Sequence, residues 1–303
     1  MEQQLQYDVI IVGGSYAGLS AAMALGRSLR KVLIIDSGRP CNRQTPHSHN
    51  FLTQDGQKPG QIAAVSRQQA LAYPTIRFHE GLAIAGEQTE QGFLVRTQAG
   101  ESFHSKKLLF TTGISDQLPE RPGFAECWGI SLLHCPYCHG YEVNGQALGL
   151  IADGELAFEM GRLLHQWSPN LTIFTNGPSS ITEERLALLE KYQVRIVEKQ
   201  IDHIRHQQGQ LEALVFTDSS THPLKAAFIR AGFVQHCSIP EQLGCALTEH
   251  GYISVDDFHK TSCYGVYAAG DCCSMFRAVS NAVAAGSKAG AAINLELIRE
   301  AFQ

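Results

Sequence analysis

The sequence lacks several features that mark particular classes of protein. Its 303 residues carry a net charge of -5, so no positive excess favours nucleic-acid binding. No apolar run reaches the roughly 18 residues of a membrane-spanning helix, and the N-terminus has no basic segment followed by an apolar core, as a signal peptide would. The 13 histidines form no metal-binding spacing. We therefore expect a cytoplasmic protein with no membrane anchor, nucleic-acid partner or metal.

The sequence does have a globular composition and many cysteines. Apolar residues make up 44% of the chain and charged residues 17%, which excludes a disordered or low-complexity chain. The length allows two domains, each with its own core. The nine cysteines are an odd count, and a reducing cytoplasm does not support a disulfide framework. A closely spaced cysteine pair therefore requires a catalytic, metal-binding or cofactor explanation.

The segment 7–36 predicts a βαβ unit, because an apolar strand is followed by a Gly-rich turn, a helix and a second apolar strand. Gly13 allows a tight turn, and Gly18 allows the helix to pack closely on the strand. Ser15 is small enough for backbone N–H groups to approach a pyrophosphate at the helix N-terminus. Asp36 ends the second strand, where a carboxylate would accept hydrogen bonds from a ribose diol. The unit therefore predicts a dinucleotide site.

A second unit of this kind begins near residue 147. The segment 147–177 predicts a strand, a turn, an amphipathic helix and another strand. A strand at 264–271 and a C-terminal helix from about 277 to 300 belong with the first unit, so the second unit is inserted into it. We therefore predict an α/β protein with two Rossmann-like, three-layer ββα domains. The first domain would consist of residues 1–116 and 246–303, and the inserted domain of residues 117–245.

The pair Cys135 and Cys138 stands in a Cys-Pro-Tyr-Cys-His segment. Cys-x-x-Cys-His is also the attachment signature of c-type haem, which would require export. A zinc site would need a second ligand pair, and the adjacent Cys272 and Cys273 have poor spacing for one. The third interpretation is a redox dithiol that closes a small disulfide ring. Glutaredoxins share Cys-Pro-Tyr-Cys, but they are small single domains with the motif near the first strand.

The order of these motifs resembles the low-molecular-weight thioredoxin reductase family over nearly the whole chain. The shared features are the Gly-rich turn, a strand ending in Thr-Thr-Gly at 111–113, the Cys-x-x-Cys pair before a second dinucleotide fold, and Ala-Ala-Gly-Asp at 268–271 before an Arg-led helix. In that family FAD lies in the domain built from both chain ends, and the inserted domain carries the disulfide and a nicotinamide site. The resemblance also implies a homodimer.

The resemblance implies an FAD site made of several segments. The pyrophosphate and the adenosine ribose would be held by Gly13, Ser15, Ala17, Gly18 and Asp36. The flavin and its ribityl chain would be held by Asn50, Thr112, Gly113, Gly270, Asp271, Arg277, Ala278 and Val279, the last three opening the C-terminal helix.

The resemblance further implies electron transfer between flavin and disulfide. Cys138 would lie nearer the flavin, and Cys135 would be the exposed thiol that exchanges with a partner through a mixed disulfide. The partner would be thioredoxin, a glutaredoxin-like protein or a small-molecule dithiol or disulfide.

One departure from the family pattern is His139, which stands where thioredoxin reductases usually carry an Asp that donates a proton. A histidine can do acid–base work near neutral pH. Cys-x-x-Cys-His is also similar to flavoprotein dithiol oxidases of natural-product pathways, which pass electrons from a small dithiol through flavin to oxygen. Reductase and oxidase directions therefore both remain open.

The second departure is the nicotinamide turn of the inserted domain. The expected G-x-G-x-x-A turn spans 152–157 and begins with Ala152, and Asp153 and Glu155 put two carboxylates where a pyrophosphate would lie. No cation follows the next strand, at 175–177, to pair with a 2′-phosphate. NAD(P)H use is therefore an open question. Backbone amides could still hold NADPH with help from Arg162 or Arg185; otherwise the domain binds NADH weakly, another nucleotide or none, and ferredoxin could be the donor.

Two rival functions are a flavin-bound sensor without turnover and a nicotinamide-dependent monooxygenase, neither of which would need Cys135. Outside the redox pair, Cys272 and Cys273 are expected to be two buried thiols rather than a strained vicinal disulfide. Cys41 is interpreted as a small buried hydrophobe, with a further redox site as the alternative.

Overall fold

The computed structural model describes residues 6–302 and divides the chain into two compact units. The first unit contains the chain up to Arg43, Asn50–Ser115 and the chain from Phe233, and the second contains Gln44–His49 and Asp116–Gly232. Residues 1–5 and 303 lie outside the described residues. Both segments belong to the first predicted domain, and residues 1–5 are also part of the N-terminal stretch from which a signal peptide was judged absent.

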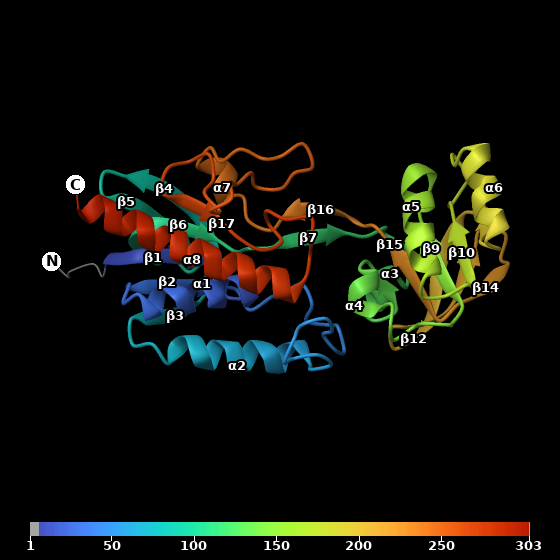
Figure 1. Cartoon of the computed structure of the whole chain (residues 1–303), viewed down its shortest axis with the longest axis horizontal. Coiled ribbons are helices and arrows are strands. Elements are labelled where there is room, and N and C mark those ends of the chain that lie inside the picture. The colour runs from blue at the N-terminus through green and yellow to red at the C-terminus, as the bar shows by residue number, and fades with distance from the viewer. Residues whose placement is uncertain (1–5, 303) are drawn as a thin grey trace. The chain divides into compact units, whose positions relative to one another are not determined.

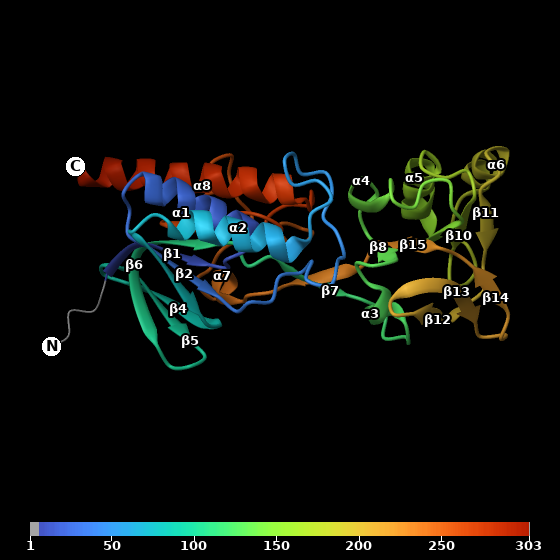
Figure 2. The same ribbon diagram turned by 90° about the horizontal axis from the view of Figure 1, so that it is seen from below.

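The first unit is built on a parallel sheet. Its strands lie in the order β3 (Ile76–Glu80), β2 (Val32–Asp36), β1 (Gln6–Val12), β6 (Ser102–Phe110) and β17 (Val266–Ala268). The antiparallel hairpin of β4 (Ala83–Thr89) and β5 (Gly92–Thr97) pairs with the first half of β6. Three helices cover the face opposite this hairpin (Figures 1 and 2): α1 (Tyr16–Arg27), α2 (Pro59–Leu71) and α8 (Val279–Ala301). The short helix α7 (Ile239–Gln242) also belongs to this unit.

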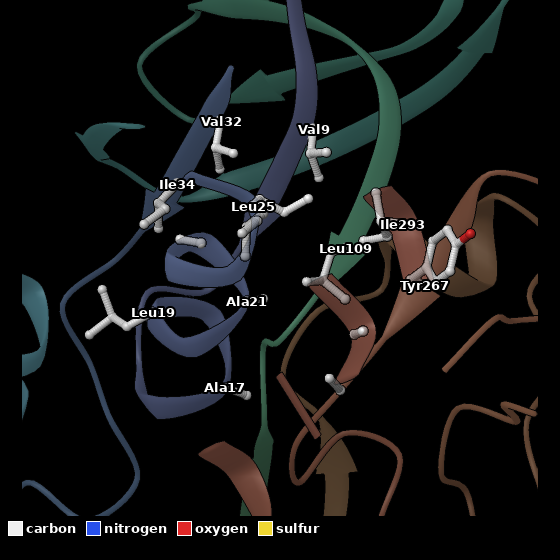
Figure 3. Close-up of a cluster of buried hydrophobic side chains, with 14 of the residues drawn as sticks. Val9, Ala17, Leu19, Ala21, Leu25, Val32, Ile34, Leu109, Tyr267 and Ile293 are labelled. Atoms are coloured by element: carbon white, nitrogen blue, oxygen red, sulfur yellow. The ribbon is translucent and has the colours of Figure 1, made fainter. Parts of the chain in front are cut away.

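The core between sheet and helices contains side chains from the N-terminal βαβ unit and from the C-terminal segment of β17 and α8. Figure 3 shows Val9, Leu25 and Ile34 from the N-terminal βαβ unit in one apolar cluster with Tyr267 and Ile293. The helices α1 and α8 approach closely because small residues line their contact. A Cβ added at Gly286 of α8 would lie 2.0 Å from the carbonyl oxygen of Ala17, so only glycine fits there.

The second unit has a parallel sheet of its own. The order is β11 (Arg195–Val197), β10 (Leu171–Phe174), β9 (Leu148–Ile151), β15 (Ala226–Ile229) and β8 (Leu132–Leu133). Helices α5 (Gly154–His165) and α6 (Glu183–Lys191) cover one face. The antiparallel sheet of β12 (Ile201–Gln207), β13 (Gln210–Phe216) and β14 (Thr221–Pro223) covers the other (Figure 2). Two short helices are α3 (Phe124–Cys127) and α4 (Pro136–His139).

Each unit therefore has the predicted three-layer arrangement, and the α/β class is confirmed. The chain enters the second unit through β7 (Ile114–Gln117) and leaves it through β16 (Gly232–Gln235), and these strands form a two-stranded sheet. The return at Phe233 comes earlier in the chain than the expected residue 246. Within residues 6–302, no helix is both long and apolar enough to cross a membrane.

Candidate functional site

The turn between β1 and α1 is tightly constrained by its glycines. Gly13 has a φ of +105°, and a Cβ added to it would lie 2.4 Å from the carbonyl oxygen of Thr111. A Cβ on Gly18 would lie 2.0 Å from the carbonyl oxygen of Gly13. Ser15 is the N-cap of α1, and Ala17 is buried against α8. The structure therefore has the tight strand-to-helix turn that the sequence predicted, and the binding of a pyrophosphate at this helix N-terminus stays a prediction.

Asp36, at the end of β2, reaches this turn. One carboxylate oxygen accepts a hydrogen bond from the backbone N–H of Gly14 at 2.5 Å, and the other accepts from Gly38 at 2.7 Å. The negative charge is thereby fixed beside the turn, at the place where a ribose diol is expected. Its contact with an adenosine ribose stays a prediction.

Thr112 and Gly113, directly after β6, form a neighbouring part of the site. The Thr112 hydroxyl is buried and has no hydrogen-bond partner among residues 6–302. Gly113 has a φ of +65°, and a Cβ built on it would meet no atom within 4 Å. A buried polar atom without a protein partner beside open space fits a polar ligand, since buried hydroxyls are normally hydrogen-bonded.

The segment after β17 completes the cradle in the first unit. Gly270 has a φ of +87°, and its Cβ position is only 3.1 Å from Ala17 Cβ in the first turn. The Arg277 Nε lies 3.8 Å from an Asp271 carboxylate oxygen. The helix α8 begins at Val279, with Ala278 as its N-cap. Arg277 therefore precedes the helix, and the prediction that it opens the helix is wrong.

Asn50 lies in the loop before α2 with a φ of +59°, and its backbone N–H donates to Asp55 at 2.7 Å. The structure thus brings the first turn together with Thr111, the residue before Thr112, and with Gly270: the Thr111 hydroxyl donates to the Gly13 carbonyl oxygen at 2.6 Å, and Gly270 lies against Ala17. Tight glycine positions, a helix N-terminus and an orphaned buried hydroxyl fit the diphosphate and sugar parts of FAD. The individual contacts stay predictions.

The second unit holds the redox pair. Cys135 and Cys138 form a disulfide, with their Cα atoms 5.3 Å apart. Cys135 is the N-cap of α4, and its Sγ accepts a hydrogen bond from the Cys138 backbone N–H at 3.1 Å. Tyr137, between the two cysteines, is 60% exposed and packs edge-on against Trp167, with ring centroids 5.5 Å apart. The pair is therefore held as the redox dithiol interpretation requires.

His139, the last residue of α4, is surrounded by groups that the sequence analysis missed. Burial lowers its pKa below the ordinary histidine value; the Glu142 carboxylate opposes this shift, and the His49 ring adds to it. The His49 Nε2 lies 3.4 Å from a Glu142 carboxylate oxygen. No local sequence signal connects His49 with His139, because the electrostatic effect of His49 depends on the segment Gln44–His49 belonging to the second unit. A neutral imidazole at pH 7 can accept a proton.

The turn between β9 and α5 contains the expected carboxylates. Asp153 is the N-cap of α5 and accepts hydrogen bonds from the backbone N–H and the hydroxyl of Ser180, at 2.9 and 2.6 Å. Slight burial opposes ionisation, but these hydrogen bonds outweigh it and lower the pKa of Asp153. The Asp153 carboxylate therefore stays charged beside the helix N-terminus, in the place where a pyrophosphate would bind.

The arginines considered as substitutes for the missing cation already have carboxylate partners. Arg185 forms an ion pair with Glu155 in the first turn of α5, and Arg162 lies 3.3 Å from Glu159. Further along, the Asn176 side-chain oxygen accepts from Arg121 and from the Ile201 backbone, both at 2.8 Å. The two arginines and the Asn176 side chain thus already have partners within the protein.

The remaining cysteines differ in part from expectation. Cys272 and Cys273 are not joined by a disulfide, as expected, but only Cys272 is fully buried. Cys41 is exposed, so its interpretation as a small buried hydrophobe is wrong. Residue size and polarity suggested burial, but the loop that carries Cys41 lies at the surface.

Comparison with known proteins gives the same assignment throughout the chain. The model of the family described as pyridine nucleotide-disulphide oxidoreductase matches residues 7–286. A thioredoxin reductase of Claviceps purpurea, tcpT, is 32% identical over 97% of this chain and 95% of its own. A thioredoxin reductase of Leptosphaeria maculans, sirT, is 30% identical over 96% and 94%. An oxidoreductase of known structure from Agrobacterium tumefaciens is 36% identical, with a TM-score of 0.91 and coverage of 97% and 99%.

The family match covers most of both units, including the disulfide and the segments predicted to hold FAD up to Val279. The chain belongs to the pyridine nucleotide-disulphide oxidoreductase family, and it is a flavoprotein enzyme of the thioredoxin reductase type that uses FAD in thiol–disulfide chemistry.

Proposed function

We propose that this enzyme runs in the oxidative direction, as a dithiol oxidase that converts a dithiol to a disulfide and reduces oxygen to hydrogen peroxide. The observation that carries the proposal is the acidic turn at the start of α5. Asp153 stays charged there, and Glu155 holds Arg185, so the turn repels the phosphates of a nicotinamide donor. In a family member that binds NADPH poorly, a substrate dithiol can supply the electrons instead.

The reaction begins at the disulfide of the second unit. A substrate thiolate attacks the Cys135 sulfur, the Cys135–Cys138 bond breaks, and Cys138 leaves as a thiolate. The second substrate thiol then attacks the mixed disulfide, which releases the oxidised substrate and the reduced pair. His139, neutral because burial lowers its pKa, accepts a proton from a thiol during these steps.

Bound FAD supplies the two-electron acceptor that regenerates the Cys135–Cys138 disulfide and passes electrons to oxygen. The chain's own part would be to hold it: the Gly13–Gly18 turn would bind the pyrophosphate, Asp36 the ribose, and Thr112 with Asp271 the flavin end. In sum, one dithiol and one oxygen molecule give one disulfide and one hydrogen peroxide.

The proposed substrate is a small-molecule dithiol rather than a thioredoxin-like protein. Its support is the His139 motif, which resembles that of small-dithiol oxidases. A homodimer in the cytoplasm is proposed from the family resemblance. The second candidate is disulfide reduction driven by NADPH or ferredoxin, and it is favoured by the name thioredoxin reductase that the relatives carry.

The direct test measures flavin reduction and oxygen uptake with purified holoprotein. In anaerobic stopped flow, we expect dithiothreitol to bleach the flavin at least about tenfold faster than NADPH or NADH at equal concentration. In air, dithiothreitol should drive oxygen uptake with one peroxide formed per oxygen. Fast bleaching by NADPH without peroxide formation would favour the reductase instead.

The variant Cys135→Ser separates the rivals, with the exposed Cys41→Ser as matched control. An oxidase loses turnover with Cys135→Ser and keeps it with Cys41→Ser. A sensor that works by binding alone, or a monooxygenase, would keep its response in both variants.

A further inference from the structure

A second pair of cysteines lies in the first unit, outside the Cys135–Cys138 site. Cys245 follows α7, and Cys263 lies in the loop that leads into β17. Neither is in a disulfide in this structure. Nothing in their spacing along the sequence marks them as a pair.

The two segments are bound to each other at both cysteines. The Cys245 thiol donates to the Thr261 hydroxyl at 3.4 Å, and the Cys263 thiol donates to the carbonyl oxygen of Leu243 at 3.1 Å. Between them, the Ala246 backbone N–H donates to the Ser262 hydroxyl at 2.9 Å. Each thiol therefore bonds to the residue two positions before the other cysteine, which places the sulfur atoms side by side.

The thiols also affect each other electrostatically. Burial, together with the neighbouring Cys263 thiol, raises the pKa of the Cys245 thiol to about 11, and the hydrogen bond between Cys245 and Thr261 opposes this shift. Cys245 is 5% exposed, whereas Cys263 is only partly buried and stands next to Tyr264, which is 70% exposed. An oxidant from solution therefore meets Cys263 first, and Cys245 is positioned behind it.

We propose that Cys245 and Cys263 are a peroxide-sensitive dithiol that closes a second disulfide in the FAD-binding unit. The oxidant is hydrogen peroxide, so its formation inside the enzyme's own turnover rests on the proposed function. In the first step the Cys263 thiolate sulfur attacks peroxide, the O–O bond breaks, and a sulfenic acid and hydroxide form. In the second step the Cys245 sulfur attacks the sulfenic sulfur, the S–O bond breaks, and the thiol proton leaves with the hydroxide as water. Two thiols and one peroxide thus give a disulfide and two waters.

The consequence is local. The cross-link joins the segment after α7 to the segment entering β17, the strand that ends close to Gly270 and Asp271. Because a disulfide restricts the unfolded chain, we expect the Tm of the holoenzyme to rise by about 5 °C. The device would stabilise the FAD-binding unit under the oxidising conditions that turnover creates.

The test treats prereduced, buffer-exchanged holoenzyme with one equivalent of hydrogen peroxide, blocks thiols with N-ethylmaleimide, and maps peptides without reduction. We expect a peptide that joins Cys245 to Cys263 in the wild type and in Cys41→Ser, and none in Cys263→Ser. Cys245→Ser should stop at a Cys263 sulfenic acid that dimedone captures. Absence of the cross-linked peptide in the wild type, or Cys263 sulfinic acid beside an unreacted Cys245, overturns the proposal.

A second arm separates this proposal from the proposed function. The holoenzyme consumes a limiting amount of dithiothreitol in air, with or without catalase, and is blocked once oxygen uptake stops. A cross-link that catalase prevents supports both proposals. A cross-link from added peroxide but none after turnover supports the dithiol and contradicts peroxide release. Peroxide release with no cross-link in either arm overturns the dithiol alone.

Discussion

The two strand–turn–helix segments of this protein have the same architecture and opposite chemistry. The first turn, 13–18, has two indispensable glycines, no acidic residue in the first turn of its helix, and a carboxylate that binds the turn from Asp36. The second, 152–157, has a carboxylate at the N-cap and another in the first helical turn. Even the last position differs, since Gly18 cannot carry a Cβ and Ala157 does.

The βαβ fold by itself therefore does not determine whether a nucleotide binds at the turn. Both units bury apolar parallel strands under a helix, but only the first has no carboxylate at the N-cap or in the first turn of that helix. The second unit keeps the layers of the fold and carries the disulfide.

The largest effect is expected for Gly18→Ala, which gives the first turn the methyl group that the second already has. The new Cβ would lie 2.0 Å from the Gly13 carbonyl oxygen, so the turn must shift. We expect FAD affinity to fall more than about 100-fold, measured as flavin retained after gel filtration. Gly60→Ala is the control, because its Cβ would meet no atom within 4 Å. A Gly18→Ala protein that keeps its flavin contradicts the contrast.

A smaller loss is expected for Asp36→Ala, which removes the carboxylate that binds Gly14 and Gly38. Losing charge-assisted hydrogen bonds of about 1.5–3 kcal/mol should weaken FAD binding about 10- to 100-fold. Fluorescence titration of the apoprotein with FAD measures the change. The control Glu80→Gln, on the neighbouring strand β3, removes only an exposed ion pair with Arg67 and should leave the affinity unchanged.

The second turn should respond in the other direction. Glu155→Gln removes one carboxylate and releases Arg185 to pair with a phosphate. We expect flavin bleaching by NADPH under anaerobic conditions to accelerate about 3- to 10-fold, a change of about 1 kcal/mol. Glu159→Gln on the same helix, which breaks only the pair with Arg162, should have no effect. Equal rates in both variants would remove the acidic turn as the barrier to NADPH.

The smallest effect is expected in the pH dependence of the dithiol-driven rate, which depends on His139 of the second unit. Burial lowers the pKa of His139, so the neutral base persists below pH 6.5, and the dithiol-dependent rate should fall only as pH drops through that lowered value. Glu142 raises this pKa, so Glu142→Gln should move the acidic limb to lower pH. Rates between pH 5 and 8 measure it, with the exposed His250→Gln as control. A limb that does not move in Glu142→Gln speaks against His139 as the proton acceptor.

The sequence predicted those parts of the fold that depend on local pattern. The strands β1, β2, β9 and β10 and the helices α1, α5 and α8 follow from apolar periodicity and glycine turns, which act within a few residues. The alternating polar strand β12 and the polar helix α6 were missed, since their apolar residues are too few to show a period. The C-terminal helix was predicted to start at Arg277, because this residue resembled a family motif, but the helix starts at Val279.

Two dinucleotide-type units, a glycine-rich turn suited to FAD, the Cys135–Cys138 pair and the acidic second turn could be identified from the sequence alone, because each consists of residues that are neighbours along the chain. Four pairings became visible only in the folded chain: Ser180 with Asp153, Arg185 with Glu155, His49 with His139, and Cys245 with Cys263. These partners are separated by many residues, and their pairing depends on how strands and helices pack, which no local periodicity encodes.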